Sequence, residues 1–184
     1  MTDVALSRPR LAVVASAAGC ALLVARPLLL AATSHPVAVL AGLFALLLVA
    51  GWAWPARALA PSRRANAAAV IAIGLAAFVL GRLAGGHSPA PFTPRILALS
   101  ALAAVAEEAF FRRLVYGALA SGGPALAVGA SALLFAVVHV TVYGAWVLPI
   151  DLAAGLVLSW QRWASGSWTV PAITHVLANL LVVI

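Results

Sequence analysis

Hydrophobic residues occupy long runs of the chain, and polar residues are confined to short breaks between these runs. Each run is close to the roughly 20 residues that an α-helix needs to cross the hydrocarbon core of a bilayer. Breaks at proline, glycine and arginine clusters separate seven such runs. The predicted spanning helices are 11–33, 37–54, 66–85, 95–120, 124–142, 145–163 and 167–184. The segments 55–64 and 86–95 are the predicted loops.

The composition also favours a membrane-embedded fold. Of the 184 residues, 65% are hydrophobic and 8% are charged, and the mean hydropathy is +1.13. Soluble domains carry about 25% charged residues, so a soluble chain of this size could not cover so much apolar surface. We therefore predict an all-α, polytopic transmembrane helical bundle with about seven spanning helices. The first run could be mistaken for a signal peptide, but its length and the spans that follow at once favour a retained helix.

The basic residues predict an orientation in the membrane. All eleven are arginine, and most border apolar runs, so we expect no nucleic-acid partner despite the net charge of +7. Seven spans place eight arginines on one side and three on the other. The larger group is Arg8, Arg10, Arg57, Arg63, Arg64, Arg112, Arg113 and Arg162, and the smaller is Arg26, Arg82 and Arg95. Because cytoplasmic loops carry the excess of basic residues, we expect the N-terminus in the cytoplasm.

Few polar groups are expected inside the membrane, where a charge near the centre costs about 3 kcal/mol or more. They are Glu107, Glu108, Arg112, Arg113, His139, Asp151, His175 and Asn179. No role or partner is predicted for Asp151. The single cysteine, Cys20, excludes a disulfide or a cysteine-ligated zinc site within the chain.

The two adjacent acids are predicted to have different neighbours. Glu108 and Arg112 are four residues apart, so they share a helix face and can form an ion pair. Glu107 is turned by about 100° from Glu108 and is free to point into the bundle, where an acid can act as a general base. The alternative is an acid pair solvated at a helix end, but Glu107 lies roughly 16 Å from the expected end near Ala118.

The histidines are ambiguous when each is taken alone. His139 in its apolar helix could be a buried core residue. His175 and Asn179 share a face, because they are four residues apart, and could equally form hydrogen bonds between helices. Pro171 lies four residues before His175, so we expect it to free the carbonyl near Ser167 and to loosen the helix there.

The polar residues of three helices could nevertheless cooperate in one reaction. They are Glu107, His139, His175 and Asn179. A carboxylate and an imidazole can polarise a water molecule, and an imidazole and an amide can stabilise an oxyanion. Such a set can hydrolyse an acyl bond without a covalent nucleophile. Ser165 and Ser167 lack the glycine context of a nucleophile elbow.

Three motifs resemble those of the CPBP family of intramembrane proteases, which includes the CAAX prenyl endopeptidases of the Rce type. They are EExxxR at Glu107–Arg112, FxxxH at Phe135–His139 and HxxxN at His175–Asn179. The resemblance covers roughly residues 92–182. It divides the single membrane domain into N-terminal helices without a signature, 1–90, and a CPBP-like catalytic core, 91–184.

The resemblance implies a role for each site residue. Glu107 and His139 would activate the attacking water, with Glu107 as the general base, and His175 and Asn179 would stabilise the oxyanion. The implied supporting residues are Glu108 and Arg112. No metal is required in this interpretation, and the alternative is a zinc ion bound by Glu107, His139 and His175.

The expected function is therefore an intramembrane endopeptidase that cleaves a membrane-associated protein or peptide among membrane lipids. The arginine-only, alanine-rich composition suggests a GC-rich bacterial genome, so we expect a bacterial cytoplasmic membrane. Neither the oligomeric state nor the substrate is predicted. The alternative is a non-enzymatic polytopic membrane protein, a transporter or bacteriocin-immunity scaffold, that uses the same polar cluster for binding or packing. A transporter would more naturally show a repeat with broken helices in both halves.

Overall fold

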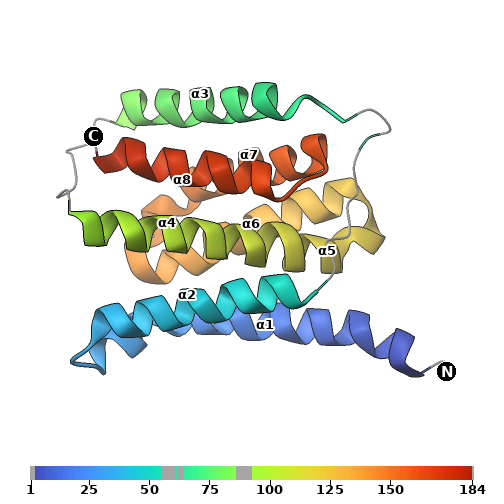
Figure 1. Cartoon of the computed structure of the whole chain (residues 1–184), viewed down its shortest axis with the longest axis horizontal. Helices are drawn as coiled ribbons and strands as arrows, with labels where there is room; N and C mark the ends of the chain where they lie inside the picture. Colours follow the sequence, from blue (N-terminus) through green and yellow to red (C-terminus); the bar gives the residue numbers. More distant parts are fainter. Residues whose placement is uncertain (1–2, 55–60, 62–63, 86–92, 184) are drawn as a thin grey trace.

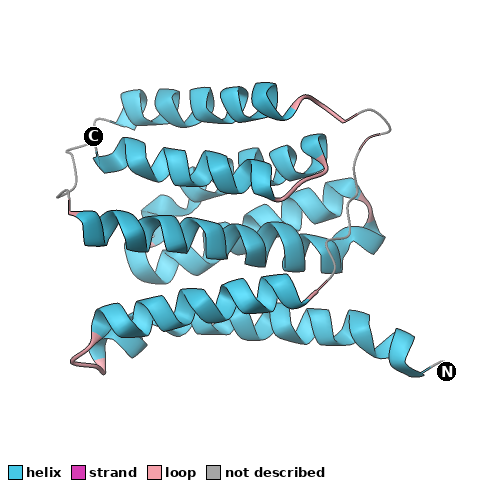
Figure 2. Ribbon diagram, in the orientation of Figure 1, coloured by secondary structure: helices cyan, strands magenta, loops and turns pink. Residues whose placement is uncertain are grey.

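The chain folds into a bundle of helical rods. The computed structural model describes residues 3–54, 61, 64–85 and 93–183, and these residues contain helices and connections but no strand (Figure 2). The first rods are α1 (Asp3–Ala31), α2 (Pro36–Ala53) and α3 (Ala67–Gly85). The fourth rod joins α4 (Pro94–Glu108), the π-helix η1 (Ala109–Val115) and α5 (Tyr116–Leu119). After the turn η2 (Ala120–Gly122) come α6 (Pro124–Tyr143), the turn η3 (Ala145–Val147), α7 (Leu148–Ser165) and α8 (Thr169–Val183). The predicted all-α bundle of about seven helices is confirmed.

The observed helix ends correct two expectations. Helix α1 extends back to Asp3, beyond the predicted start at residue 11, although its candidate spanning segment, Arg10–Ala31, agrees with the predicted 11–33. Most of the two predicted loops lies outside the described residues. Helix α8 begins at Thr169, so Pro171 lies in its first turn, where a missing N–H removes no helical hydrogen bond. The Ser167 carbonyl instead lies 3.1 Å from the Ser165 hydroxyl. The expected loosening beside His175 is therefore wrong.

The rods lie side by side in a fixed order (Figure 1). Helix α4 packs between α8 and α2, and α3 covers α8 and α7 on the outer side. Helices α6 and α7 share the most extensive interface, and α1 contacts both α2 and α6. The N-terminal helices thus belong to the same bundle as the helices that carry the motifs, while the division at residue 90 stays a prediction.

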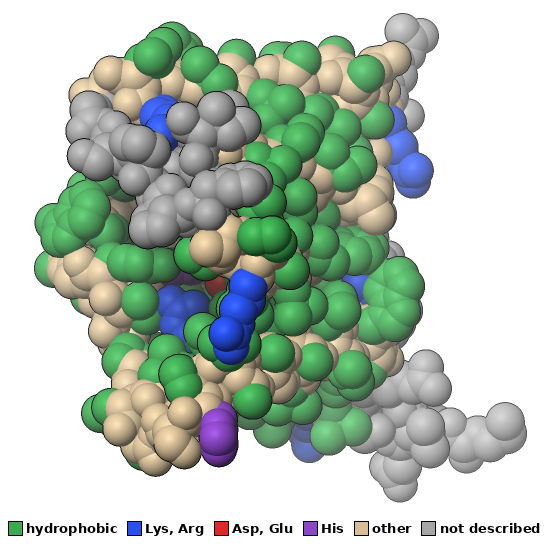
Figure 3. Space-filling view, turned by 60° about the vertical axis from the view of Figure 1, so that its left-hand side comes forward, with side chains coloured by type: hydrophobic (Ala, Val, Ile, Leu, Met, Phe, Trp, Pro, Cys, Tyr) green, Lys and Arg blue, Asp and Glu red, His purple; other side chains and the backbone are tan. Residues whose placement is uncertain are grey.

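The outer surface is apolar. Four described helices are long and apolar enough to cross a membrane: Arg10–Ala31, Pro36–Ala53, Ala67–Ala84 and Pro124–Tyr143. Large side chains such as Leu28 (75% exposed) and Leu83 (76% exposed) point outward, and hydrophobic atoms cover much of the visible face (Figure 3). Apolar patches of this extent are suited to lipid. The protein is an integral membrane protein.

The fourth rod changes to π-helical geometry directly after the two acids. In a π-helix each N–H bonds to the carbonyl five residues earlier, as Tyr116 does to Phe111. Neighbouring helices supply further donors to this segment. The Ser131 hydroxyl of α6 donates to the Phe111 carbonyl at 3.0 Å, and Arg162 Nε of α7 donates to the Arg112 carbonyl at 2.9 Å. Because lipid offers no hydrogen bonds, these side chains stabilise the irregular backbone.

Candidate active site

The adjacent acids face different neighbours, as the helical period predicts. The Glu108 side chain is fully buried, and its Oε2 lies 3.2 Å from Arg112 Nε. Its Oε1 accepts a hydrogen bond from His175 Nδ1 at 3.0 Å, so this carboxylate joins α4 to α8. The Glu107 side chain is 6% exposed and lines a cavity. Glu108 therefore has two fixed cationic or donor partners, whereas Glu107 faces open space.

The cavity collects all four predicted catalytic residues. It has a volume of about 580 Å³, and every rod of the described bundle contributes to its wall. Its polar wall includes Glu107, His139, His175 and Asn179. The remaining wall is mostly apolar, with Leu30, Leu40, Phe44, Phe78, Leu99 and Leu158 among its side chains. A mostly apolar cavity with a few convergent polar groups is typical of a binding site.

His139 and Glu107 are arranged around a position suited to one water molecule. His139 Nδ1 lies 2.7 Å from the Phe135 carbonyl, which can only accept, so Nδ1 carries the proton and donates it. His139 Nε2 lies 3.9 Å from Glu107 Oε1. This separation is too long for a direct hydrogen bond, but a water molecule beside both atoms can bridge them.

His175 and Asn179 project together from α8, and each side chain forms one hydrogen bond with a residue of α4. His175 Nδ1 is hydrogen-bonded to Glu108, so Nε2 is the ring nitrogen that can reach a ligand. Asn179 Nδ2 donates to the Ser100 carbonyl at 3.3 Å, and the same amide nitrogen carries a second N–H. The predicted shared face is thus observed, and its polar groups are oriented by hydrogen bonds.

Phe135 orients several of these groups, a role that its place in the FxxxH motif did not reveal. Its ring centroid is 4.6 Å from that of His139 and 5.9 Å from that of His175. The Arg112 guanidinium lies over the same ring, 4.9 Å from its centroid. Aromatic and cation–π contacts therefore fix both imidazoles and the arginine around one side chain.

Other polar residues have positions that the sequence did not predict. Asp151, which had no predicted role, lines the cavity within electrostatic reach of His139. Arg26 of α1 also lines it. Arg113 turns away from the cavity, donates to the Gly51 carbonyl at 3.0 Å and thereby binds the end of α2. The only available signal for Asp151 and Arg26 was an ionisable residue within an apolar run.

The described residues do not form a metal site. No group of three histidine, cysteine, aspartate or glutamate side chains within them is placed to hold a metal ion. Zinc sites in hydrolases require three protein ligands around one point. The metal-free mechanism and the zinc alternative of Glu107, His139 and His175 both stay predictions, and the mechanism proposed below uses protein side chains alone.

A family model described as "Type II CAAX prenyl endopeptidase Rce1-like" matches residues 89–181, just over half of the 184 residues. The chain belongs to this family. The match contains all three motifs, and membership in the Rce1-like family indicates intramembrane protease activity and does not favour the non-enzymatic alternative. Searches of the curated proteins and of the solved structures returned no match.

The matched region of this Rce1-like protein does not enclose the cavity by itself. Helices α1, α2 and α3 precede residue 89, yet Arg26, Phe44 and Phe78 come from these helices and line the wall. The N-terminal helices therefore form part of the cavity wall.

Proposed function

We propose that this protein is an intramembrane endopeptidase whose attacking water is activated by Glu107 and His139. The observation that carries the proposal is the 3.9 Å separation of Glu107 Oε1 and His139 Nε2 at the wall of the shared cavity. A water molecule at that position donates one hydrogen bond to the carboxylate and one to the imidazole. Both groups then increase the nucleophilicity of the water oxygen.

In the first step the water oxygen attacks the carbonyl carbon of the scissile peptide bond. A C–O bond forms, the water proton passes to Glu107, and the carbonyl electron pair moves onto oxygen. Phe135 keeps His139 in the required tautomer, because its carbonyl holds the Nδ1 proton and leaves the Nε2 lone pair for the water.

His175 and Asn179 stabilise the resulting oxyanion. Asn179 donates its second amide hydrogen, and His175 donates from Nε2 as an imidazolium, with Glu108 as counter-ion at Nδ1. Each donor of an oxyanion site contributes about a hundred- to thousandfold to kcat. Arg112 in turn holds Glu108 through their ion pair.

In the second step Glu107 gives its proton to the departing nitrogen. The C–N bond breaks, the oxyanion reforms a carbonyl, and the products are a carboxylic acid and an amine. Protons and electrons balance without an external reactant. The mostly apolar wall suits a membrane-associated protein or peptide as substrate, approached among the membrane lipids.

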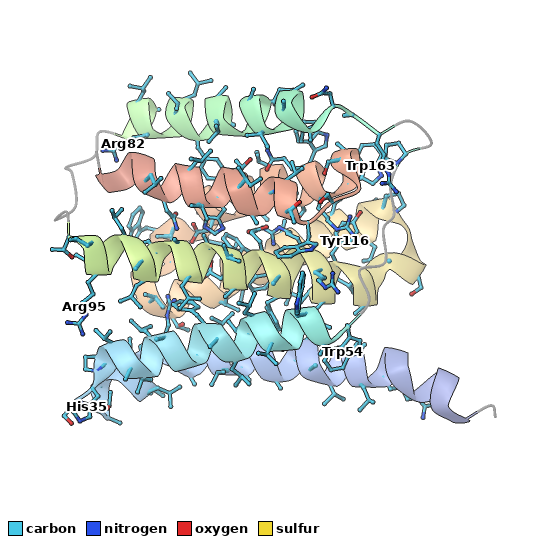
Figure 4. The ribbon with its side chains drawn as sticks, viewed as in Figure 1. His35, Trp54, Arg82, Arg95, Tyr116 and Trp163 are labelled. Carbon is cyan, nitrogen blue, oxygen red and sulfur yellow. The ribbon has the colours of Figure 1, made fainter. Side chains whose placement is uncertain are left out.

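The orientation of the bundle completes the proposal. Among the described members of the larger arginine group, Arg10 lies near the start of α1, Arg64 shortly before α3 and Arg162 near the end of α7. The smaller group includes Arg82 and Arg95 at the opposite end of the bundle (Figure 4). Basic residues favour the cytoplasmic side. The N-terminus is thus proposed to be cytoplasmic, in a bacterial cytoplasmic membrane.

The test is peptide hydrolysis by the purified full chain in liposomes, with products identified by mass spectrometry from a pool of membrane peptides. Glu107→Gln and His139→Ala should each lower kcat by about a hundredfold or more. The control Asp3→Asn makes the same acid-to-amide change in the first turn of α1 and should leave turnover unchanged. Normal turnover by Glu107→Gln would refute the assignment, and inhibition by EDTA with recovery in zinc would replace it with a metal mechanism.

A further inference from the structure

One basic side chain inside the bundle is not used by the proposed mechanism. Arg26 of α1 is 8% exposed and lines the cavity together with Glu107. Arg112 has Glu108 as its counter-ion, and Arg113 donates to the backbone of α2. Within the described part of the chain, no hydrogen bond or ion pair involves the Arg26 side chain.

A simple structural role does not account for Arg26. Arginines near the ends of spanning helices often extend to the membrane interface, and Arg26 lies five residues before the end of α1 at Ala31. Its side chain is instead enclosed by the bundle and borders the catalytic cavity. A guanidinium without a counter-ion at the wall of a mostly apolar cavity offers a binding partner to an anionic group that enters the cavity.

We propose that Arg26 binds a carboxylate of the peptide substrate and thereby determines which peptides are cleaved. The guanidinium fork matches the two oxygens of a carboxylate and can donate two parallel hydrogen bonds. This inference rests on the proposed peptidase function. The carboxylate can belong to the C-terminus of the peptide or to an acidic side chain.

The other charges of the cavity orient such a peptide. Glu107 and Asp151 also line the wall, and neither carboxylate lies within ion-pair distance of Arg26. Both repel a third carboxylate. Among the cationic groups of the wall, His175 already has Glu108 as a partner, so Arg26 is the favourable position. Figure 3 shows basic and acidic atoms close together in a hollow on one face of the molecule. With the carboxylate held at Arg26, the remaining chain of the peptide extends through the cavity toward Glu107.

Arg26 lies in a different part of the chain from the three motifs. It lies in α1, outside the region 89–181 that the family model matches. The residues proposed for water activation and oxyanion binding all lie inside that region. Chemistry and substrate selection are thus carried by different parts of the chain and can be separated by mutation.

The experiment uses three N-acetylated peptides that share one apolar sequence of leucine and alanine. The first ends in a free carboxylate, the second in an amide, and the third in an amide with one internal glutamate. The wild type in liposomes should prefer a carboxylate-bearing peptide over the plain amide by roughly ten- to hundredfold in kcat/KM, mainly through KM. Arg26→Gln should lose this preference and keep kcat, and Arg26→Lys should retain part of it. Preference for the first or the third peptide identifies the source of the carboxylate.

The matched control is Arg95→Gln, which removes an exposed cation at the start of α4 (Figure 4). It should keep the full preference, because an exposed charge is screened by solvent. An unchanged preference in Arg26→Gln overturns the proposal while leaving the peptidase function intact.

A binding measurement separates the two possible failures. The same peptides are titrated into the Glu107→Gln protein in detergent, and binding is followed by tryptophan fluorescence. If the wild type cleaves no peptide, the peptidase function fails. The role of Arg26 is still supported if Glu107→Gln binds a carboxylate peptide more tightly than the plain amide and if Glu107→Gln/Arg26→Gln does not. Equal binding of all three peptides contradicts it. Should Arg26→Gln not fold, Arg26→Lys is used for the same comparison.

Discussion

The buried ion pair of Glu108 and Arg112 provides a quantitative test of the site architecture. Both side chains are fully buried, with Oε2 and Nε 3.2 Å apart, and the Arg112 Nη1 lies 3.4 Å from the Ser131 hydroxyl. Glu108→Gln leaves the guanidinium in place without its counter-ion. Removal of one member of a buried pair costs about 3–5 kcal/mol, because the remaining charge is desolvated and uncompensated. His175 also loses a charged acceptor, so kcat should fall with the stability.

The double variant Glu108→Gln/Arg112→Met separates the pair energy from other effects of the substitutions. It removes both charges and fills the space beside the Phe135 ring with an apolar side chain. Because replacement of a whole buried ion pair by apolar groups is often neutral, the double variant should recover most of the lost stability. Activity should not recover, since His175 still lacks the carboxylate at Nδ1.

The assay is equilibrium unfolding in mixed micelles, followed by the fluorescence of the six tryptophans, with hydrolysis measured on the same samples. The single variants Glu108→Gln and Arg112→Met, the double variant and the wild type form a double-mutant cycle. A coupling energy below about 0.5 kcal/mol would mean that the two side chains act independently. That result would refute the reasoning, as would full activity of the folded double variant.

Two further predictions concern helix packing and orientation. A Cβ at Gly51 would clash with the backbone of the π-helix, whereas one at Gly42 in the same helix meets nothing within 4 Å. Gly51→Ala should therefore destabilise the protein by about 1–3 kcal/mol in the same unfolding assay. Gly42→Ala should stabilise it by up to about 1 kcal/mol. Equal effects of the two substitutions would contradict the close packing of α2 against the π-helix. In a background without the single cysteine, Ser34→Cys should react in intact cells with a membrane-impermeant maleimide, and Ser121→Cys only after permeabilisation. The reverse pattern would place the N-terminus outside.

The fold could be predicted because the bilayer fixes the length of each apolar run. Seven runs of suitable length became seven rods, and prolines 36, 94 and 124 mark the starts of three helices. The π-helix could not be predicted in this way. Its carbonyls are paired with Ser131 and Arg162, which lie on other helices, so the geometry depends on tertiary contacts. The start of α8 was misjudged for a local reason, since Gly166 ends α7 in a left-handed conformation (φ +69°) and the next helix begins only at Thr169.

Contacts within one helix were predictable, and contacts between helices were not. The spacing of four residues predicted the Glu108–Arg112 pair and the common face of His175 and Asn179. The hydrogen bond from His175 to Glu108 depends on the register of α8 against α4, which no spacing in the sequence encodes. The same limitation applies to Asp151 and Arg26. Each was recognisable as an ionisable residue in an apolar run, but its neighbours are defined only by the assembled bundle.

The two members of each charged doublet, Glu107–Glu108 and Arg112–Arg113, have different neighbours because successive helical residues point in different directions. Glu108 is directed at Arg112 and His175, while Glu107 faces the cavity. The neighbouring arginines diverge in the same manner, since Arg113 binds the end of α2. One member of each doublet therefore maintains the bundle, and in the acidic doublet this leaves the other free for chemistry. In the proposed mechanism Glu108 therefore cannot substitute for a missing Glu107. Its two partners, Arg112 and His175, hold it away from the proposed water position, and its release would require breaking the contact that joins α4 to α8.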